Sequence, residues 1–235
     1  MNKPMEKLFK KWQEQYSFSA FIEDGIVDSD KYEEPHILFV LRDMNCCTLR
    51  NLCKDLCKSG SGAKTWCNAG RWVKALLDED EDYPYDMSPQ KRSEQLRRVA
   101  VMNIKKEGGT ARADGDDLTK YAQEQREMIL EEIRMCNPDI IICCGQGMKN
   151  APSNAEILEK KVFCIDAKWD SIESGAFPRK WNYFYAMIND KSVPVVSFCH
   201  PQTTNLCGKR GHEALFKPLY RDMKVIGQKL LWRKD

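Results

Sequence analysis

The sequence has no long apolar run and almost no excess of charge of one sign. No stretch reaches about 18 apolar residues, so we expect no membrane-spanning helix and no membrane partner. The net charge is only +2 at pH 7, which excludes the blanket positive charge of a histone-like protein and leaves room for a local basic patch. The N-terminal segment 1–16 is charged throughout and lacks the pattern of a signal peptide.

Motifs for metals, nucleotides and zinc-dependent deamination are also missing. The chain has eleven cysteines, but no C-x-x-C pair and no neighbouring histidine pair completes a structural zinc site. The odd number favours a reducing cytosol over a disulfide framework. The zinc deaminase signature, the third glycine of a dinucleotide motif and the phosphate-loop lysine motif are absent. An iron–sulfur cluster stays an alternative to buried free thiols for the cysteines of one short span: Cys46, Cys47, Cys53, Cys57 and Cys67. We expect no metal and no cofactor.

Four short, nearly continuous apolar runs are present, and each predicts a buried strand: 36–40, 98–103, 138–144 and 194–199. The segment 162–165 predicts an additional edge strand. Apolar residues at helical spacing predict an opening helix at about 4–16 and later helices over 71–77, 118–135 and 213–232. The alternation predicts a single α/β domain over 1–235, with three αβα layers around a central, mainly parallel four-stranded sheet. We expect a cytoplasmic monomer.

Polar residues follow the ends of these strands. Asp43 and Asn45 come after the first run, Asn103 ends the second, Gly145 to Gly147 follow the third, and His200 follows the fourth. In an open α/β sheet, ligands bind outside the carboxyl ends of the strands. The sequence therefore predicts that a carboxylate, two amides and an imidazole converge on one edge.

Each of these residues also has a purely structural interpretation. Asp43 could cap a following helix, His200 could pack at a strand end, and Asn103 could close a turn. A thiol nucleophile at Cys199 is disfavoured, because adjacent residues of a strand point to opposite faces and Cys199 would not meet His200. The convergence of several such groups at strand ends is what favours a site.

The four strand-end motifs resemble those of the uracil-DNA glycosylase superfamily, in the same order along the chain. "VLRDMNCC" is similar to the family's G-Q-D-P-Y-H element, with Asp43 in place of the aspartate. "VAVMNIKK" offers Asn103 as the base-reading asparagine, "IIICCGQG" fits the third strand, and "SFCHPQTTN" is similar to H-P-S and offers His200. The resemblance covers roughly residues 34–224.

Several positions depart from the family pattern. Leu41 and Arg42 replace glycine and glutamine, and Met44 replaces proline. Asn45 replaces the tyrosine that crowds C5 of uracil, and Gln202 replaces the serine of H-P-S. A smaller polar residue at position 45 leaves room beside C5, which favours a C5-substituted pyrimidine such as the hydroxymethylated or glucosylated cytosines of phage DNA.

The resemblance implies roles for these residues. Asp43 would stabilise the sugar cation and orient water, His200 would stabilise the departing base anion, and Asn45 and Asn103 would bind the flipped base. Trp66 is the candidate stacking surface for that base. DNA, double- or single-stranded, would contact the segment 202–210 through Gln202, Thr203, Asn205, Leu206 as an apolar wedge, Lys209 and Arg210, with Lys105 adding a phosphate contact. An exposed loop is the structural alternative for that segment.

The sequence thus leads to three functional hypotheses. The first is a monofunctional DNA glycosylase that removes a modified pyrimidine and leaves an abasic site, an activity that would serve antiviral defence. The second is repair of uracil or of mismatched uracil by the same fold. The third is a nucleic-acid-binding module without turnover, which the pairing of Asp43 with His200 disfavours, because binding alone needs neither an acid nor an imidazole.

Overall fold

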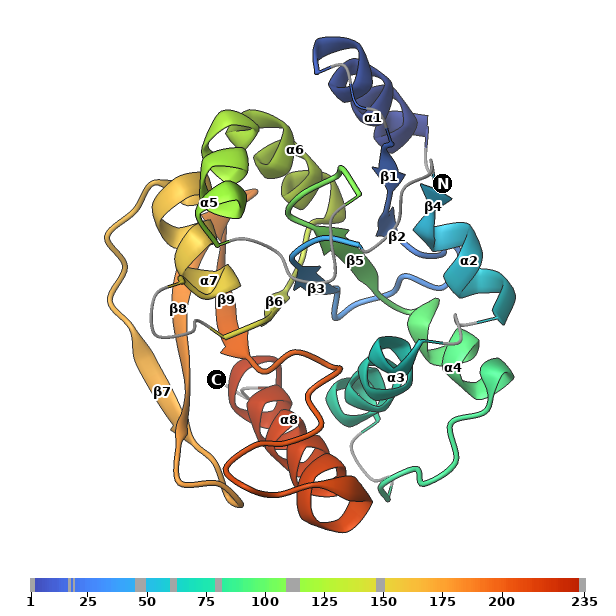
Figure 1. The fold of residues 1–235 in the computed structure, drawn as a ribbon, viewed down its shortest axis with the longest axis vertical. Coiled ribbons are helices and arrows are strands. Elements are labelled where there is room, and N and C mark those ends of the chain that lie inside the picture. Colours follow the sequence, from blue (N-terminus) through green and yellow to red (C-terminus); the bar gives the residue numbers. More distant parts are fainter. Residues whose placement is uncertain are drawn as a thin grey trace.

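A seven-stranded mixed sheet runs through the centre of the protein in the computed structural model (Figure 1). The structure describes residues 3–16, 18, 20–44, 50–59, 63–78, 82–108, 115–146 and 151–232. The order of strands across the sheet is β2-β5-β3-β6-β9-β8-β7. A separate parallel pairing joins β1 (Ile22–Glu23) to β4 (Arg50–Asn51).

The four predicted strands form the parallel centre of the sheet. They are β3 (Ile37–Leu41), β5 (Ala100–Asn103), β6 (Ile140–Cys144) and β9 (Lys191–Phe198), and each lies parallel to its neighbours in the order β5-β3-β6-β9. The residues of β3, β5 and β6 are all buried. The predicted α/β class and parallel centre are therefore confirmed, since runs buried on both faces need no alternation of polar side chains.

The predicted size of the sheet is wrong, because three antiparallel strands extend it. β2 (Gly25–Ile26) pairs with β5, while β8 (Lys180–Ile188) pairs with β9 and β7 (Asp170–Glu173) pairs with β8. In β8, exposed and buried residues largely alternate, so it lacks the continuous apolar run used to find the other strands. Asn189 and Asp190 form its turn into β9 with φ of 47° and 63°, a left-handed pair typical of two-residue hairpins.

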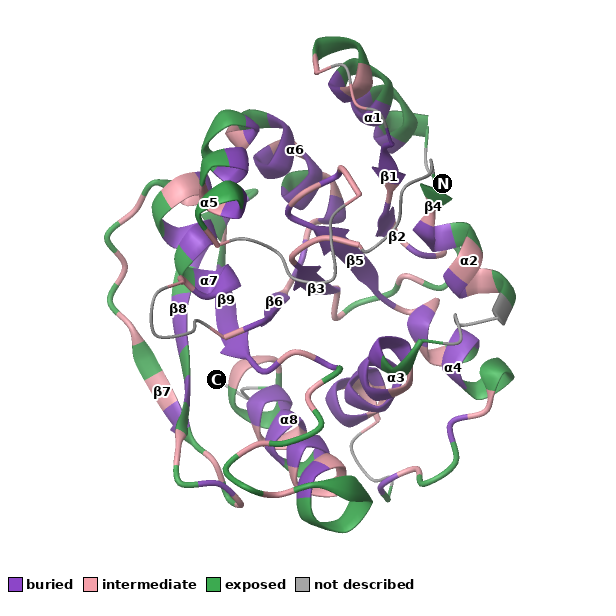
Figure 2. Cartoon of the chain, in the orientation of Figure 1, coloured by how far each residue is buried: buried purple, intermediate pink, exposed green. Residues whose placement is uncertain are grey.

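Helices cover both faces of the sheet, as the three-layer prediction requires (Figure 1). One face carries α1 (Lys3–Gln15), α5 (Gly115–Glu124), α6 (Arg126–Cys136), α7 (Asn154–Ile157) and the π-helix η1 (Leu158–Phe163). The other carries α2 (Leu52–Ser59), α3 (Lys64–Leu77), α4 (Pro89–Leu96) and α8 (Lys217–Leu230), which follows the π-helix η2 (His212–Phe216). Figure 2 shows the buried sides of these helices turned towards the sheet.

Two other predictions about local structure are wrong. The segment 162–165 is not a strand, because Val162 and Phe163 end η1 and Cys164 turns the chain with a φ of 56°. Upstream, Ser153 and Glu156 form a capping box, which is a helix-start signal visible in the sequence. The predicted helix over 118–135 is two helices, α5 and α6, which meet at Gln125. In the described parts of the chain, no helix has both the length and the apolar character to cross a membrane.

Candidate active site

The carboxyl ends of the four parallel strands lie along one edge of the sheet. Leu41 pairs with Asn103 across β3 and β5, and Cys144 pairs with Phe198 across β6 and β9, so the strands end in register. The residues that follow the strand ends therefore come to the same edge, as the sequence predicts.

Asp43 is a half-buried carboxylate two residues beyond β3. Burial raises its pKa, while the positive charges of Lys105 and Arg42 act in the opposite direction. Lys105 follows β5, its backbone N–H donates to the Arg42 carbonyl at 2.9 Å, and its ammonium lies 2.6 Å from a carboxylate oxygen of Asp117 at the start of α5. A desolvated carboxylate can stabilise a developing positive charge on a substrate, and the nearby cations favour the ionised form of this carboxylate.

Arg42, next to Asp43, is held by two contacts from beyond β6. Its Nε donates to Oδ1 of Asn154 at 3.1 Å and its Nη2 to the Pro152 carbonyl at 2.8 Å. Asn154 is fully buried, and its Nδ2 donates to the carbonyls of Cys144 and Val40, at the ends of two neighbouring strands. Sequence reasoning treated Arg42 only as a departure from the family pattern and missed Asn154, although the capping box beside it marks a helix start.

Gly145 makes the close packing of Arg42 against Asn154 possible. Its φ is +144°, a conformation that residues with a side chain rarely adopt. A Cβ at this position would lie 3.2 Å from Nδ2 of Asn154 and 3.4 Å from Nε of Arg42. The glycine that follows the third strand is therefore required by the contact between Arg42 and Asn154.

His200 is held as a neutral imidazole. The backbone N–H of Gln202 donates to His200 Nδ1 at 3.1 Å, so the ring proton of the neutral form belongs on Nε2. Burial lowers the pKa of His200, and the nearby charge of Arg42 lowers it further. The ring therefore offers an N–H donor at neutral pH. The adjacent Cys199 is buried, and burial raises its pKa to about 12, which gives no support to a thiolate nucleophile.

The loop that carries His200 is fastened to α3. Asn68 Nδ2 donates to the Pro201 carbonyl at 2.6 Å, and Arg71 Nη1 donates to Asn68 Oδ1 at 3.0 Å. Arg71 also donates to the carbonyls of Pro84 and Tyr85. These residues of α3 were not singled out from the sequence, because a polar residue on a helix gives no sign of which distant loop it contacts.

Two predicted base-binding residues are more enclosed than their roles suggest. Asn103 is 1% exposed, and both its backbone N–H and its Nδ2 donate to Asp24. Trp66 is 5% exposed and lies in the first turn of α3, inside the core on that face of the sheet. Trp66 thus presents no open face for stacking in this conformation. Asn45, the residue proposed to select the base, lies outside the described residues.

The predicted DNA-binding loop contains a tight hairpin. Leu206 and Lys209 exchange two backbone hydrogen bonds, and the turn residues Cys207 and Gly208 have φ of 51° and 77°. Leu206 is partly buried against the core, and Lys209 donates to the Ala176 carbonyl. The remaining predicted contacts include exposed side chains and one that is partly buried: Gln202, Asn205 and Arg210 are exposed, and Thr203 is partly buried.

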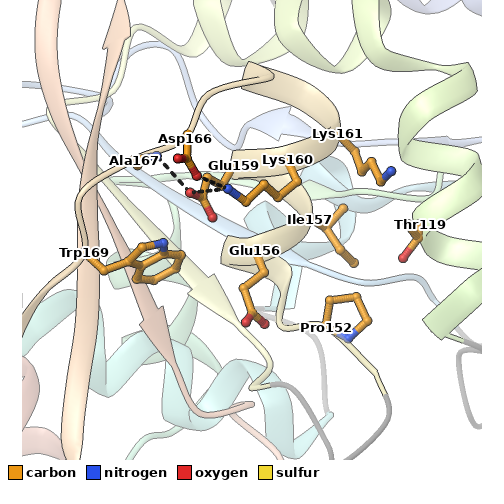
Figure 3. A pocket seen from close by; sticks show the side chains of 10 residues that line it. All are labelled: Thr119, Pro152, Glu156, Ile157, Glu159, Lys160, Lys161, Asp166, Ala167 and Trp169. Atoms are coloured by element: carbon orange, nitrogen blue, oxygen red, sulfur yellow. Dashed lines mark hydrogen bonds and ion pairs between the residues drawn. The ribbon is translucent and has the colours of Figure 1, made fainter.

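A cavity of about 460 Å³ is lined by residues of α5, α7 and η1 together with Pro152 and Trp169 (Figure 3). Lys160 pairs with Asp166 at 2.6 Å and with Glu159 at 3.2 Å, so these charged groups largely neutralise one another. Such a lining favours no particular ligand charge.

Comparisons with known proteins add no assignment. No protein-family model matches the chain, and no curated protein matches it.

In the described segments no three histidine, cysteine or acidic side chains are grouped as a metal site would need, and Cys46 and Cys47 lie outside those segments.

Proposed function

We propose that this protein is a monofunctional DNA glycosylase that hydrolyses the N-glycosidic bond of a flipped-out pyrimidine, with a C5-modified base as the preferred substrate. The observation that carries the proposal is the pair at the edge of the sheet: a desolvated carboxylate, Asp43, and a neutral imidazole with its proton on Nε2, His200. The preference for a modified base rests on Asn45 and on the sequence alone.

The two groups suit the two charges that appear when this bond breaks. As C1′–N1 lengthens, its electron pair leaves with the base, the sugar becomes cationic and the base anionic. The Asp43 carboxylate stabilises the cation and orients a water whose oxygen bonds to C1′, and the water proton passes to the carboxylate. The Nε2–H of His200 stabilises the base anion by donating a hydrogen bond. Asp43 then releases this proton, which reaches the base anion through solvent, so the carboxylate is regenerated and the products are the free base and an abasic sugar.

An excision assay tests the proposal directly. The protein is incubated with duplex and single-stranded oligonucleotides that carry uracil, hydroxymethyluracil, hydroxymethylcytosine or glucosylated hydroxymethylcytosine, and abasic sites are then cleaved with alkali. We expect breaks at one or more of the modified bases. Breaks at uracil alone would favour the repair hypothesis, and retained DNA binding without any breaks would favour a module without turnover.

The pH profile of excision should reflect both groups. Activity needs ionised Asp43 and neutral His200, so it falls on acidification as either group gains a proton. Because the pKa of Asp43 is raised above 3.8, we expect the acid limb of kcat/KM to lie above that value, and because the pKa of His200 is lowered below 6.5, we expect protonation of His200 to reduce activity only below that value. Single-turnover rates from about pH 4 to 8 would measure it. In Asp43→Asn, where only His200 of the two can gain a proton, a residual limb centred above pH 6.5 would contradict the neutral His200.

A further inference from the structure

Three fully buried charged side chains lie behind the carboxyl end of β5. Asp24 comes from the junction of β1 and β2, Lys106 follows β5, and Glu132 belongs to α6. The Lys106 ammonium contacts Asp24 Oδ1 and lies 2.6 Å from Glu132 Oε2. The rings of Phe9 and Trp12, both on α1, face the ammonium at 5.6 and 5.4 Å. The group is thus sealed from water by the first helix.

Asp24 connects this buried group to Asn103. Its Oδ2 accepts the backbone N–H of Asn103 at 2.7 Å and the side-chain Nδ2 at 3.0 Å. A carboxylate oxygen accepts hydrogen bonds and an amide oxygen cannot donate one, so a flipped Asn103 amide would set two acceptors against each other. The contact therefore fixes Nδ2 towards Asp24 and Oδ1 on the other side of the planar amide.

The orientation of an amide decides which pyrimidine it can bind. Cytosine has an amino donor at C4 and an acceptor at N3, whereas uracil has a carbonyl acceptor at C4 and a donor at N3. An amide that contacts both the C4 substituent and N3 can pair with one of these bases in one orientation. After a flip of the amide it can pair with the other base. A fixed amide discriminates between them, and a freely rotating amide does not.

Stability alone does not account for three charges in this place. Buried ion pairs can often be replaced by apolar residues without loss of stability, so the charges need another explanation. Asp24 supplies the acceptor that Asn103 needs, and Lys106 balances the charge of Asp24. Burial raises the pKa of Glu132 well above its ordinary value, while the attraction of Lys106 acts in the opposite direction.

We propose that Asp24, held by Lys106 and Glu132, is a positioning residue that fixes the Asn103 amide and thereby sets the preference between cytosine-type and uracil-type bases. The proposal rests on the proposed function and on the base-reading role that the resemblance implies for Asn103.

The test compares two duplexes that differ only at the C4–N3 edge of the target base, one with hydroxymethylcytosine and one with hydroxymethyluracil. We expect the wild-type protein to prefer one of them, and Asp24→Asn to reduce the ratio of single-turnover rates by about tenfold or more, because an asparagine at 24 can pair with either orientation of Asn103. Asp222→Asn is the matched control. Asp222 is also buried, and its carboxylate accepts from Trp181 and Ser174 in the core beneath α8, away from Asn103. An unchanged ratio in Asp24→Asn would overturn the proposal.

A second measurement does not depend on activity. In protein labelled with ¹⁵N-asparagine, the side-chain NH₂ signals of Asn103, identified by their loss in Asn103→Ala, should exchange slowly with solvent in the wild type and in Asp222→Asn. They should lose this protection in Asp24→Asn. Rapid exchange in the wild type would overturn the positioning role. Slow exchange in a wild-type protein that excises neither base would instead overturn the proposed function and keep the positioning. Should Asp24→Asn fail to fold, the double variant Asp24→Asn, Lys106→Met replaces it in both measurements.

Discussion

Replacing Asp43 with asparagine should lower the single-turnover rate of base excision by about 100- to 1000-fold, because it removes the negative charge that faces the sugar cation. Asparagine keeps the size of the side chain, so DNA binding should stay within about twofold of the wild type by fluorescence anisotropy at fixed salt. The raised pKa of Asp43 means that ionisation of this carboxyl group costs more free energy in the folded protein than in the unfolded chain.

The same substitution should therefore leave the melting temperature unchanged or raise it. Removal of an active-site charge that opposes folding commonly has this effect. If Asp43 only capped a helix, Asp43→Asn would keep full activity, because asparagine is an equally good cap, and Asp43→Ala would lower stability without a specific effect on excision. Either result would remove Asp43 from the mechanism.

The largest effect on stability should come from Lys106→Met. It leaves Asp24 fully buried with no cation beside it, and removal of one partner of a buried ion pair costs about 3–5 kcal/mol. Urea unfolding, with the midpoint compared at an unchanged slope, would measure the loss in the free energy of unfolding.

Lys10→Met is the matched control for this variant. Lys10 is 79% exposed on α1 and lies 3.8 Å from Glu14, so its replacement should change the free energy of unfolding by about 0.5 kcal/mol or less. A similarly small loss in Lys106→Met would show that water or a rearranged side chain neutralises Asp24.

The sequence predicts the parts of this fold that depend on local composition. Buried parallel strands need continuous apolar residues, and β3, β5, β6 and β9 have them. It did not predict β8, whose buried and exposed residues largely alternate, although Asn189 and Asp190 are typical hairpin-turn residues. A search for continuous apolar runs finds strands that are buried on both faces, but it misses strands in which buried and exposed residues alternate.

The residues of the candidate site likewise divide into those that the sequence predicts and those that it does not. Asp43, Asn103 and His200 were found because each follows a strand, and strand ends are visible in the sequence. Asp24 and Asn154 were not, because each acts through a contact to a residue far away in the chain, and one sequence carries no record of such contacts. The burial of Trp66 was missed for a related reason, since α3 begins earlier than its apolar spacing indicated.

The sheet contains pairs of strands that are close together in the chain and pairs that are far apart in the chain. β7, β8 and β9 follow one another in the chain and pair in that order, so this part can assemble by closing short loops. β3 pairs with β5 and β6 only after long intervening segments have been brought together, and such closures lose more chain entropy and slow folding. We expect these non-local pairs to form late, and Asp43 and Asn103 lie at their ends. Active protein should therefore accumulate only in the last step of folding, after most of the antiparallel structure has already formed.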